Sequence, residues 1–231
     1  VLLAMFQYAA SNITFFISIT WLRPYIEERW GSQAANLSAL PLLIGAVALW
    51  LSGTLVTLLH KQGMPVLSRR IPAMVGFALG AIGLLMCTQT ADSETVWPLI
   101  ICFSIALFGV EMTLSPSWAL CMDIGGDRSG AVSGAMNMVG NMGAALSAVV
   151  FPYFVANVTL PYFAVETGTA NSFFVFAATI NALALVAWLF MNPLRQLREL
   201  SAGQLRVRLA SFAVMIVGVI AALAYTNFLM R

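Results

Sequence analysis

Residues 103–118 read FSIALFGVEMTLSPSW, an apolar stretch whose one acidic side chain is Glu111. The stretch lies inside a longer apolar segment, 97–122, and a helix of roughly 20 apolar residues crosses the hydrocarbon core of a bilayer. An acidic side chain at the centre of such a helix costs about 2.5–3.5 kcal/mol on insertion scales. We therefore expect 97–122 to span a membrane and Glu111 to face a cavity. A neutral carboxyl group bonded to a neighbouring helix is the alternative.

Six other apolar segments extend this interpretation to the whole chain. They are 2–22, 34–59, 71–90, 130–156, 171–192 and 209–229. Only 9% of the 231 residues are charged, against about 25% in a soluble domain. The sequence therefore predicts an all-α, polytopic membrane protein whose main partner is the lipid bilayer, with no nucleic acid partner. Because Val1 opens directly on an apolar stretch, we also expect the beginning of the chain to be missing.

The charges between the apolar segments predict an orientation, because Lys and Arg in short loops favour the cytoplasmic side. The first, third and fifth breaks hold two such residues, Arg23 and Arg29. The second, fourth and sixth breaks hold eight: Lys61, Arg69, Arg70, Arg128, Arg195, Arg198, Arg206 and Arg208. We expect the even-numbered loops to be cytoplasmic and the first segment to run outward.

Two segments carry a stripe of polar or aromatic residues along one helical face. In the first segment the stripe comprises Gln7, Ser11, Thr14, Ser18 and Trp21. In 97–122 it comprises Ser104, Phe108, Glu111, Ser115 and Trp118. We expect both stripes to line a cavity, the alternative being hydrogen bonds between helices. Pro116 removes a backbone donor and frees the carbonyl of Met112, which predicts a bend beside a mid-membrane site.

The segment 130–156 begins GAVSGAMNMVGNMG and combines small residues with two amides. Gly130 and Gly134 form a G-x-x-x-G pair, which lets another helix backbone approach closely. Asn137 and Asn141 lie on the same helical face, one and two turns further on. We expect a gate-like helix beside a polar cavity, with simple helix–helix hydrogen bonds as the alternative for the two asparagines.

The residue types that bind metals or perform covalent catalysis are scattered. Cys87, Cys102 and Cys121 lie within or at the end of apolar segments without metal-ligand spacing, which is typical of buried, inert thiols. His60, the only histidine, stands beside Lys61 at a segment end and is expected in a loop. We predict no cofactor, no metal site and no enzymatic activity.

The stretch that starts at Ser115, SPSWALCMDIGGDRSGAVSGAMNMVGNMG, resembles the tenth and eleventh helices of the anion:cation symporter family of the major facilitator superfamily. The family pattern runs S-P-x-W, then D-I-G-G, then S-G-x-x-S-G-x-M-N-x-x-G-N-x-G. The first segment is similar to the family's seventh helix, with Gln7 followed by FFISITWLRPYI, and Asn192-Pro193 resembles its closing motif. The resemblance covers about 1–200.

This resemblance implies a fold of two six-helix bundles with a substrate site between them. Residues 1–194 would be the C-terminal bundle. The family ends after its twelfth helix, and this chain departs from it by adding what we expect to be a basic cytoplasmic linker at 195–208 and an additional transmembrane helix at 209–231. The implied function is secondary active transport in a bacterial inner membrane: symport of an organic anion such as a hexuronate, an aldonate or another sugar acid. A proton is the expected coupling ion in preference to Na⁺, and a missing N-terminal six-helix half is the expected partner.

The resemblance and the stripes together name the candidate site residues. Substrate contact is expected for Gln7, Ser11, Thr14, Ser115, Ser117, Trp118, Asn137 and Asn141. Glu111 is the candidate proton-coupling group, and Gly130 and Gly134 are candidates for helix packing or gating. Thr57 stands where the family's gate motif between its eighth and ninth helices has an aspartate, which weakens a charge-paired gate.

Three alternatives compete with a transporter half. A seven-helix receptor or sensor fits the number of segments, but the charge asymmetry predicts the opposite orientation. A half-size carrier could act as a dimer of this chain. A membrane enzyme would need a convergent set of His, Asp or Cys residues, which the sequence does not contain.

Overall fold

The structure is a computed structural model that describes residues 1–90, 93–158 and 170–196, together with 203, 206, 207, 210, 211, 213 and 214. These residues form α-helices and short 3-10 turns without a strand, which confirms the predicted all-α fold. Most of the predicted segment 209–229 and most of the linker 195–208 lie outside the described residues.

The described helices match six of the predicted apolar segments. They are α1 (Leu2–Thr20), α4 (Ala39–Lys61), α5 (Leu67–Cys87), α6 (Trp97–Met112) continued by α7 (Leu114–Gly125), α8 (Ser129–Asn157) and α9 (Asn171–Phe190). Among the described residues, five helical stretches are long and apolar enough to cross a membrane. The longest, Trp97–Asn157, turns back at Gly126, whose φ of 51° suits glycine, and so supplies two crossings.

One predicted boundary was wrong. The break expected at 23–31 is largely a helix, α2 (Leu22–Trp30), which is followed by α3 (Ser32–Ala35). Ile26 of α2 is fully buried in the hydrophobic core. Trp21 stacks on Phe151 with 5.6 Å between ring centroids, so the chain leaving α1 packs back onto the bundle instead of forming a loop.

The helix expected at 97–122 is interrupted at Thr113, close to the bend predicted from Pro116. Pro116 has no N–H to offer, so the carbonyl of Met112 is left without its usual partner within the helix. The hydroxyl of Ser52 in α4 donates a hydrogen bond to this carbonyl at 2.5 Å. The predicted freeing of Met112 is therefore confirmed, and the freed group links α4 to the junction of α6 and α7.

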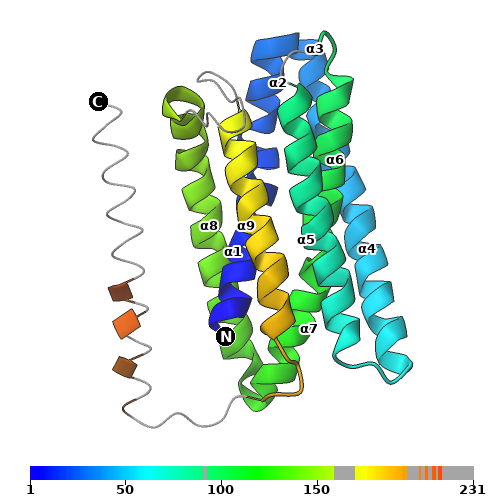
Figure 1. The fold of residues 1–231 in the computed structure, drawn as a ribbon, viewed down its shortest axis with the longest axis vertical. Coiled ribbons are helices and arrows are strands. Elements are labelled where there is room, and N and C mark those ends of the chain that lie inside the picture. The colour runs from blue at the N-terminus through cyan, green and yellow to red at the C-terminus, as the bar shows by residue number, and fades with distance from the viewer. Residues whose placement is uncertain are drawn as a thin grey trace.

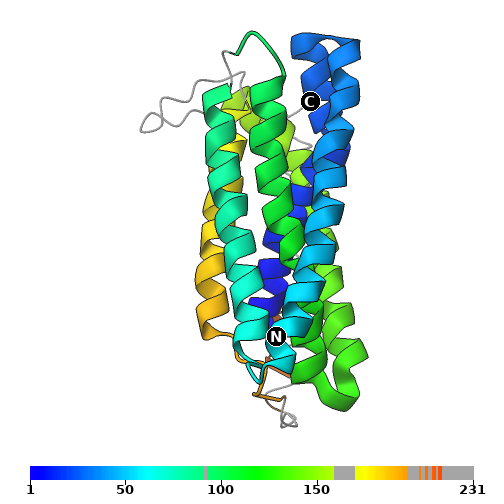
Figure 2. The same ribbon diagram turned by 90° about the vertical axis from the view of Figure 1, so that its right-hand side faces the viewer.

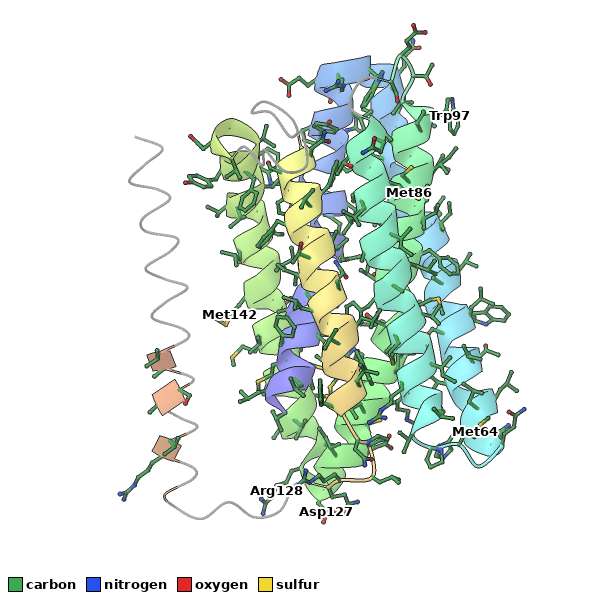
Figure 3. All side chains as sticks on the ribbon, in the orientation of Figure 1. Met64, Met86, Trp97, Asp127, Arg128 and Met142 are labelled. Carbon is green, nitrogen blue, oxygen red and sulfur yellow. The ribbon has the colours of Figure 1, made fainter. Side chains whose placement is uncertain are left out.

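The helices stand side by side in a single bundle (Figure 1). The main contacts of α1 are with α8, α5 lies between α6 and α9, and α4 packs on α6. Figure 2 shows the same bundle turned by 90°, with the α4–α5 and α7–α8 connections at one end. Asp127 and Arg128 lie at that end together with Met64, and Trp97 lies at the other (Figure 3).

Ion pairing at the end that holds the α4–α5 connection ties three helices together. Arg69, at the start of α5, donates to both carboxylate oxygens of Asp123 in α7, at 2.9 and 3.3 Å. A further nitrogen of Arg69 lies 3.3 Å from Nδ1 of His60 in α4. Thr57 donates to Gly53 in its own helix and makes no link of this kind. The Arg69–Asp123 ion pair therefore joins helices within this bundle. It does not involve Thr57, the position where the family's gate motif has an aspartate.

A buried amide connects four helices in the interior. The Gln7 side chain of α1 is fully buried. Its carbonyl oxygen accepts hydrogen bonds from Ser117 of α7 at 3.0 Å and from the indole of Trp188 of α9 at 3.3 Å. Its NH₂ group donates to the Ala4 carbonyl at 2.9 Å and approaches the sulfur of Met136 in α8 at 3.8 Å. All the hydrogen-bonding capacity of this amide is used inside the bundle.

We expect Gln7→Met to lower the free energy of unfolding by about 1–3 kcal/mol, because it keeps the side-chain length but leaves the buried Trp188 indole without its acceptor. Thermal unfolding of the detergent-purified, full-length protein measures the effect. Ser11→Ala is the control, since Ser11 donates only to Tyr8 of its own helix. An unchanged melting temperature for Gln7→Met would contradict the structural role.

Candidate functional site

A cavity of about 260 Å³ opens between α1, the α6–α7 junction and α8. Its walls are both polar and apolar. The lining residues are Tyr8, Ser11, Asn12, Phe15, Phe16, Val110, Glu111, Leu114, Asn137 and Asn141. We call this cavity the central pocket. A concave site that combines aromatic walls with a few convergent polar groups is the usual form of a small-molecule site.

Four of the candidate residues from the sequence meet in the central pocket. Ser11 comes from α1, Glu111 from the last turn of α6, and Asn137 and Asn141 from α8. The sequence placed these residues on three separate helical faces, and the fold brings the three faces together. The pocket therefore contains a carboxyl group, two amides and a hydroxyl group that a bound molecule can reach.

Glu111 is the only ionisable carboxyl group among the residues that line the pocket. Within the part of the chain that the structure describes, it takes part in no hydrogen bond or ion pair. Space for it comes from Gly45 in α4, because a Cβ atom there would lie 2.9 Å from Cγ of Glu111. The expectation that Glu111 faces a cavity is confirmed.

Three other candidates point into the bundle instead of the pocket. Gln7, Thr14 and Ser117 are each at most 1% exposed. Thr14 accepts a hydrogen bond from Asn181 of α9 at 2.9 Å, and Ser117 donates to Gln7. In this conformation their polar groups serve helix–helix contacts, so substrate contact by these residues stays a prediction.

The remaining two substrate candidates flank the pocket. Ser115 points toward α4, where its hydroxyl lies 3.4 Å from the carbonyl of Leu49. Trp118 is 36% exposed and meets the ring of Tyr8 edge-on, with 6.2 Å between ring centroids. Trp118 is therefore close to the pocket wall without being one of its lining residues.

Sequence reasoning missed Tyr8 and Asn12, which both line the central pocket. They are four residues apart in α1 and so share one helical face, next to the stripe that starts at Gln7. Asn12 takes part in no hydrogen bond among the described residues. A polar amide at that depth in an apolar helix was the signal that could have identified it.

The glycines of α8 divide into two groups. A Cβ atom at Gly130 or Gly134 would meet nothing within 4 Å, so no described helix packs against this predicted G-x-x-x-G pair, and its packing role stays a prediction. The close approach occurs two turns further on, where Gly140 and Gly143 face α1. These two glycines form what we call the α1–α8 seam.

Comparison with known proteins places these features in a family. The family model of the Major Facilitator Superfamily matches residues 1–148. The chain is 31% identical over 183 residues to the probable sulfoacetate transporter of Cupriavidus necator, covering 78% of this chain and 40% of that protein. It is 24% identical over 190 residues to the probable galactarate/D-glucarate transporter of Escherichia coli, covering 80% of this chain and 39% of that protein.

A plant protein shows the same relationship. The probable chloroplastic anion transporter 2 of Oryza sativa is 26% identical over 151 residues, which are 63% of this chain and 27% of that protein. The chain thus spans at most about two fifths of the length of these relatives. Because the family match covers more than half of its residues, this chain belongs to the major facilitator superfamily.

Proposed function

We propose that the chain is the C-terminal six-helix half of a secondary active transporter that carries a small organic anion together with protons. The observation that carries the proposal is the central pocket, where helices α1, α6 and α8 present Ser11, Glu111, Asn137 and Asn141 to one cavity. The names of the relatives support an anion as the substrate, because each is described as a transporter of an anion or of named organic acids.

The lining of the pocket suits the neutral part of such a substrate. Asn12, Asn137 and Asn141 each offer two donors and one acceptor oxygen. Groups of this kind match the hydroxyl groups of a sugar acid such as a hexuronate, an aldonate or an aldarate. The rings of Tyr8, Phe15 and Phe16 can pack against its carbon chain.

The charge of the substrate needs a partner that these residues do not supply. No Lys or Arg is among the residues that line the central pocket. In the proposed complete transporter, the N-terminal six-helix half would face this pocket and provide the cation that pairs with the acid group.

Glu111 is the proposed proton-coupling group. A carboxylate in the pocket repels an anionic substrate, whereas the protonated carboxyl group can donate a hydrogen bond to it. Binding of the proton and binding of the anion would then favour each other, which is the thermodynamic requirement for symport. A proton is the proposed coupling ion in preference to Na⁺, because the carboxyl group of Glu111 can take up and release one directly.

The proposed orientation follows the charges. The end with Lys61, Arg69 and Arg128 would face the cytoplasm, in a bacterial inner membrane. Residues 195–208 would be a basic cytoplasmic linker and 209–231 an additional transmembrane helix. Family membership favours this transporter over a seven-helix receptor or an enzyme.

The proton-coupling role is tested by Glu111→Gln in the full-length transporter, with D-glucarate and sulfoacetate as the uptake probes. We expect uptake driven by a pH gradient to fall about tenfold or more and exchange of substrate without a gradient to persist, because Gln keeps the hydrogen bond but cannot release a proton. Uptake in proteoliposomes with and without a pH gradient measures both. Unchanged dependence on the gradient would rule out the coupling role.

Direct contact between Asn137 and the substrate is tested by Asn137→Ala. Loss of one amide contact should raise KM for the transported acid about 2- to 10-fold, which corresponds to one hydrogen bond of about 0.5–1.5 kcal/mol. Asn157→Ala is the matched control, since Asn157 lies in the same helix, is exposed and donates to Tyr153 of that helix. An equal change in KM for the two variants would contradict direct contact by Asn137.

A further inference from the structure

Gly140 lies in the interior of α8, where a glycine has an energetic cost. In a helix interior, glycine is about 1 kcal/mol less favourable than alanine. The neighbouring helix explains its presence. A Cβ atom on Gly140 would collide with Cδ1 of Tyr8, and would lie 2.5 Å from Nδ2 of Asn12 and 2.8 Å from Cε1 of Tyr8. Carbon atoms that are not bonded to each other settle near 3.5–4.0 Å, so a methyl group here would displace both side chains of α1.

The two side chains that fill this space are both walls of the central pocket. Tyr8 has little freedom to move away, because its ring is buried and meets Trp118 edge-on at 6.2 Å. Asn12 is half-buried and is bonded to no other described residue. Its amide can therefore swing, and the open space beside it is the pocket itself.

The other glycine of the α1–α8 seam has a different neighbour. A Cβ atom on Gly143 would lie 2.8 Å from the backbone oxygen and 3.1 Å from Cα of Ala9. A methyl group at 143 would separate the two helix backbones, whereas one at 140 would move pocket side chains. Gly134, in the same helix, has nothing within 4 Å of its Cβ position. These three glycines form a natural series.

We infer that Gly140 is a positioning residue that sets the width of the central pocket. Because Gly140 has no side chain, Tyr8 and Asn12 can occupy the space beside it and leave the pocket open for a bound molecule. The inference rests on the proposed function only for the identity of that molecule. A substrate that only just fits the central pocket would be excluded if residue 140 carried a side chain.

The test measures pocket width through a thiol. Asn137→Cys in the full-length transporter places a reactive group on the pocket wall, and Cys87, Cys102 and Cys121 of this chain are buried. Labelling rates with methyl and with benzyl methanethiosulfonate report access by a small and a bulky reagent. The same protein without Asn137→Cys gives the background. Gly134→Ala, Gly140→Ala and Gly143→Ala are compared in the Asn137→Cys protein.

We expect Gly140→Ala to lower the ratio of the benzyl to the methyl labelling rate about fivefold or more. A change of this size is what modest overpacking of the pocket wall would produce. Gly134→Ala should leave the ratio unchanged, and Gly143→Ala should lower the melting temperature. Adding Asn12→Ala to Gly140→Ala should restore much of the ratio, because the smaller side chain leaves room for the new methyl group.

Two results would overturn the inference. One is an equal labelling ratio for Gly140→Ala and Gly134→Ala in folded protein. The other is a Gly140→Ala variant that unfolds as Gly143→Ala does and is not rescued by Asn12→Ala, which would make Gly140 a packing residue only. Labelling requires no transport, so the result stands even if neither D-glucarate nor sulfoacetate is carried, an outcome that would count against the proposed function alone.

Discussion

Close approach of helix backbones at glycine is the interaction on which the rest of this structure depends. Lipid tails are as apolar as the side chains that face them, so helices in a membrane associate through packing and hydrogen bonds instead of the hydrophobic effect. A Cβ atom at Gly109 of α6 would collide with the backbone of α5, and one at Gly83 of α5 with the backbone of α6. The Gly143 contact holds α8 against α1 in the same way. These contacts hold the helices at short range and so help to set which polar faces meet.

The second constraint is the satisfaction of polar groups away from water. Each polar side chain inside the bundle needs a partner, because an unpaired buried group costs about 1–3 kcal/mol. Gln7 satisfies this need fully within the interior. Glu111 and Asn12, which have no partner among the described residues, line the open cavity instead. In these three residues, pairing inside the bundle goes with a structural role, and the lack of a partner goes with a place on the cavity wall.

Much of the fold, but only part of the candidate site, follows from the sequence. Apolar length predicts the spans because every spanning segment faces the same solvent, the bilayer. A helical stripe, in contrast, shows that a face is turned away from lipid without showing what it meets. Gln7 and Ser11 belong to one stripe, yet the first is bonded inside the bundle and the second reaches the pocket. The difference depends on which helix lies opposite each turn of α1, and that is a property of three-dimensional packing.

The central pocket lacks the positive charge that an anion-binding site needs. It holds one carboxyl group and no basic side chain, while the basic residues described in this chain lie beyond its walls. An anion would meet only amides, hydroxyls and a carboxyl group here, an arrangement with no net attraction for it unless the carboxyl group is protonated. In the proposed transporter, a site built this way would bind its anion only in concert with a proton and a cation from outside the bundle. Such dependence on several simultaneous contacts would let one face of a bundle recognise a substrate without holding it too tightly to release.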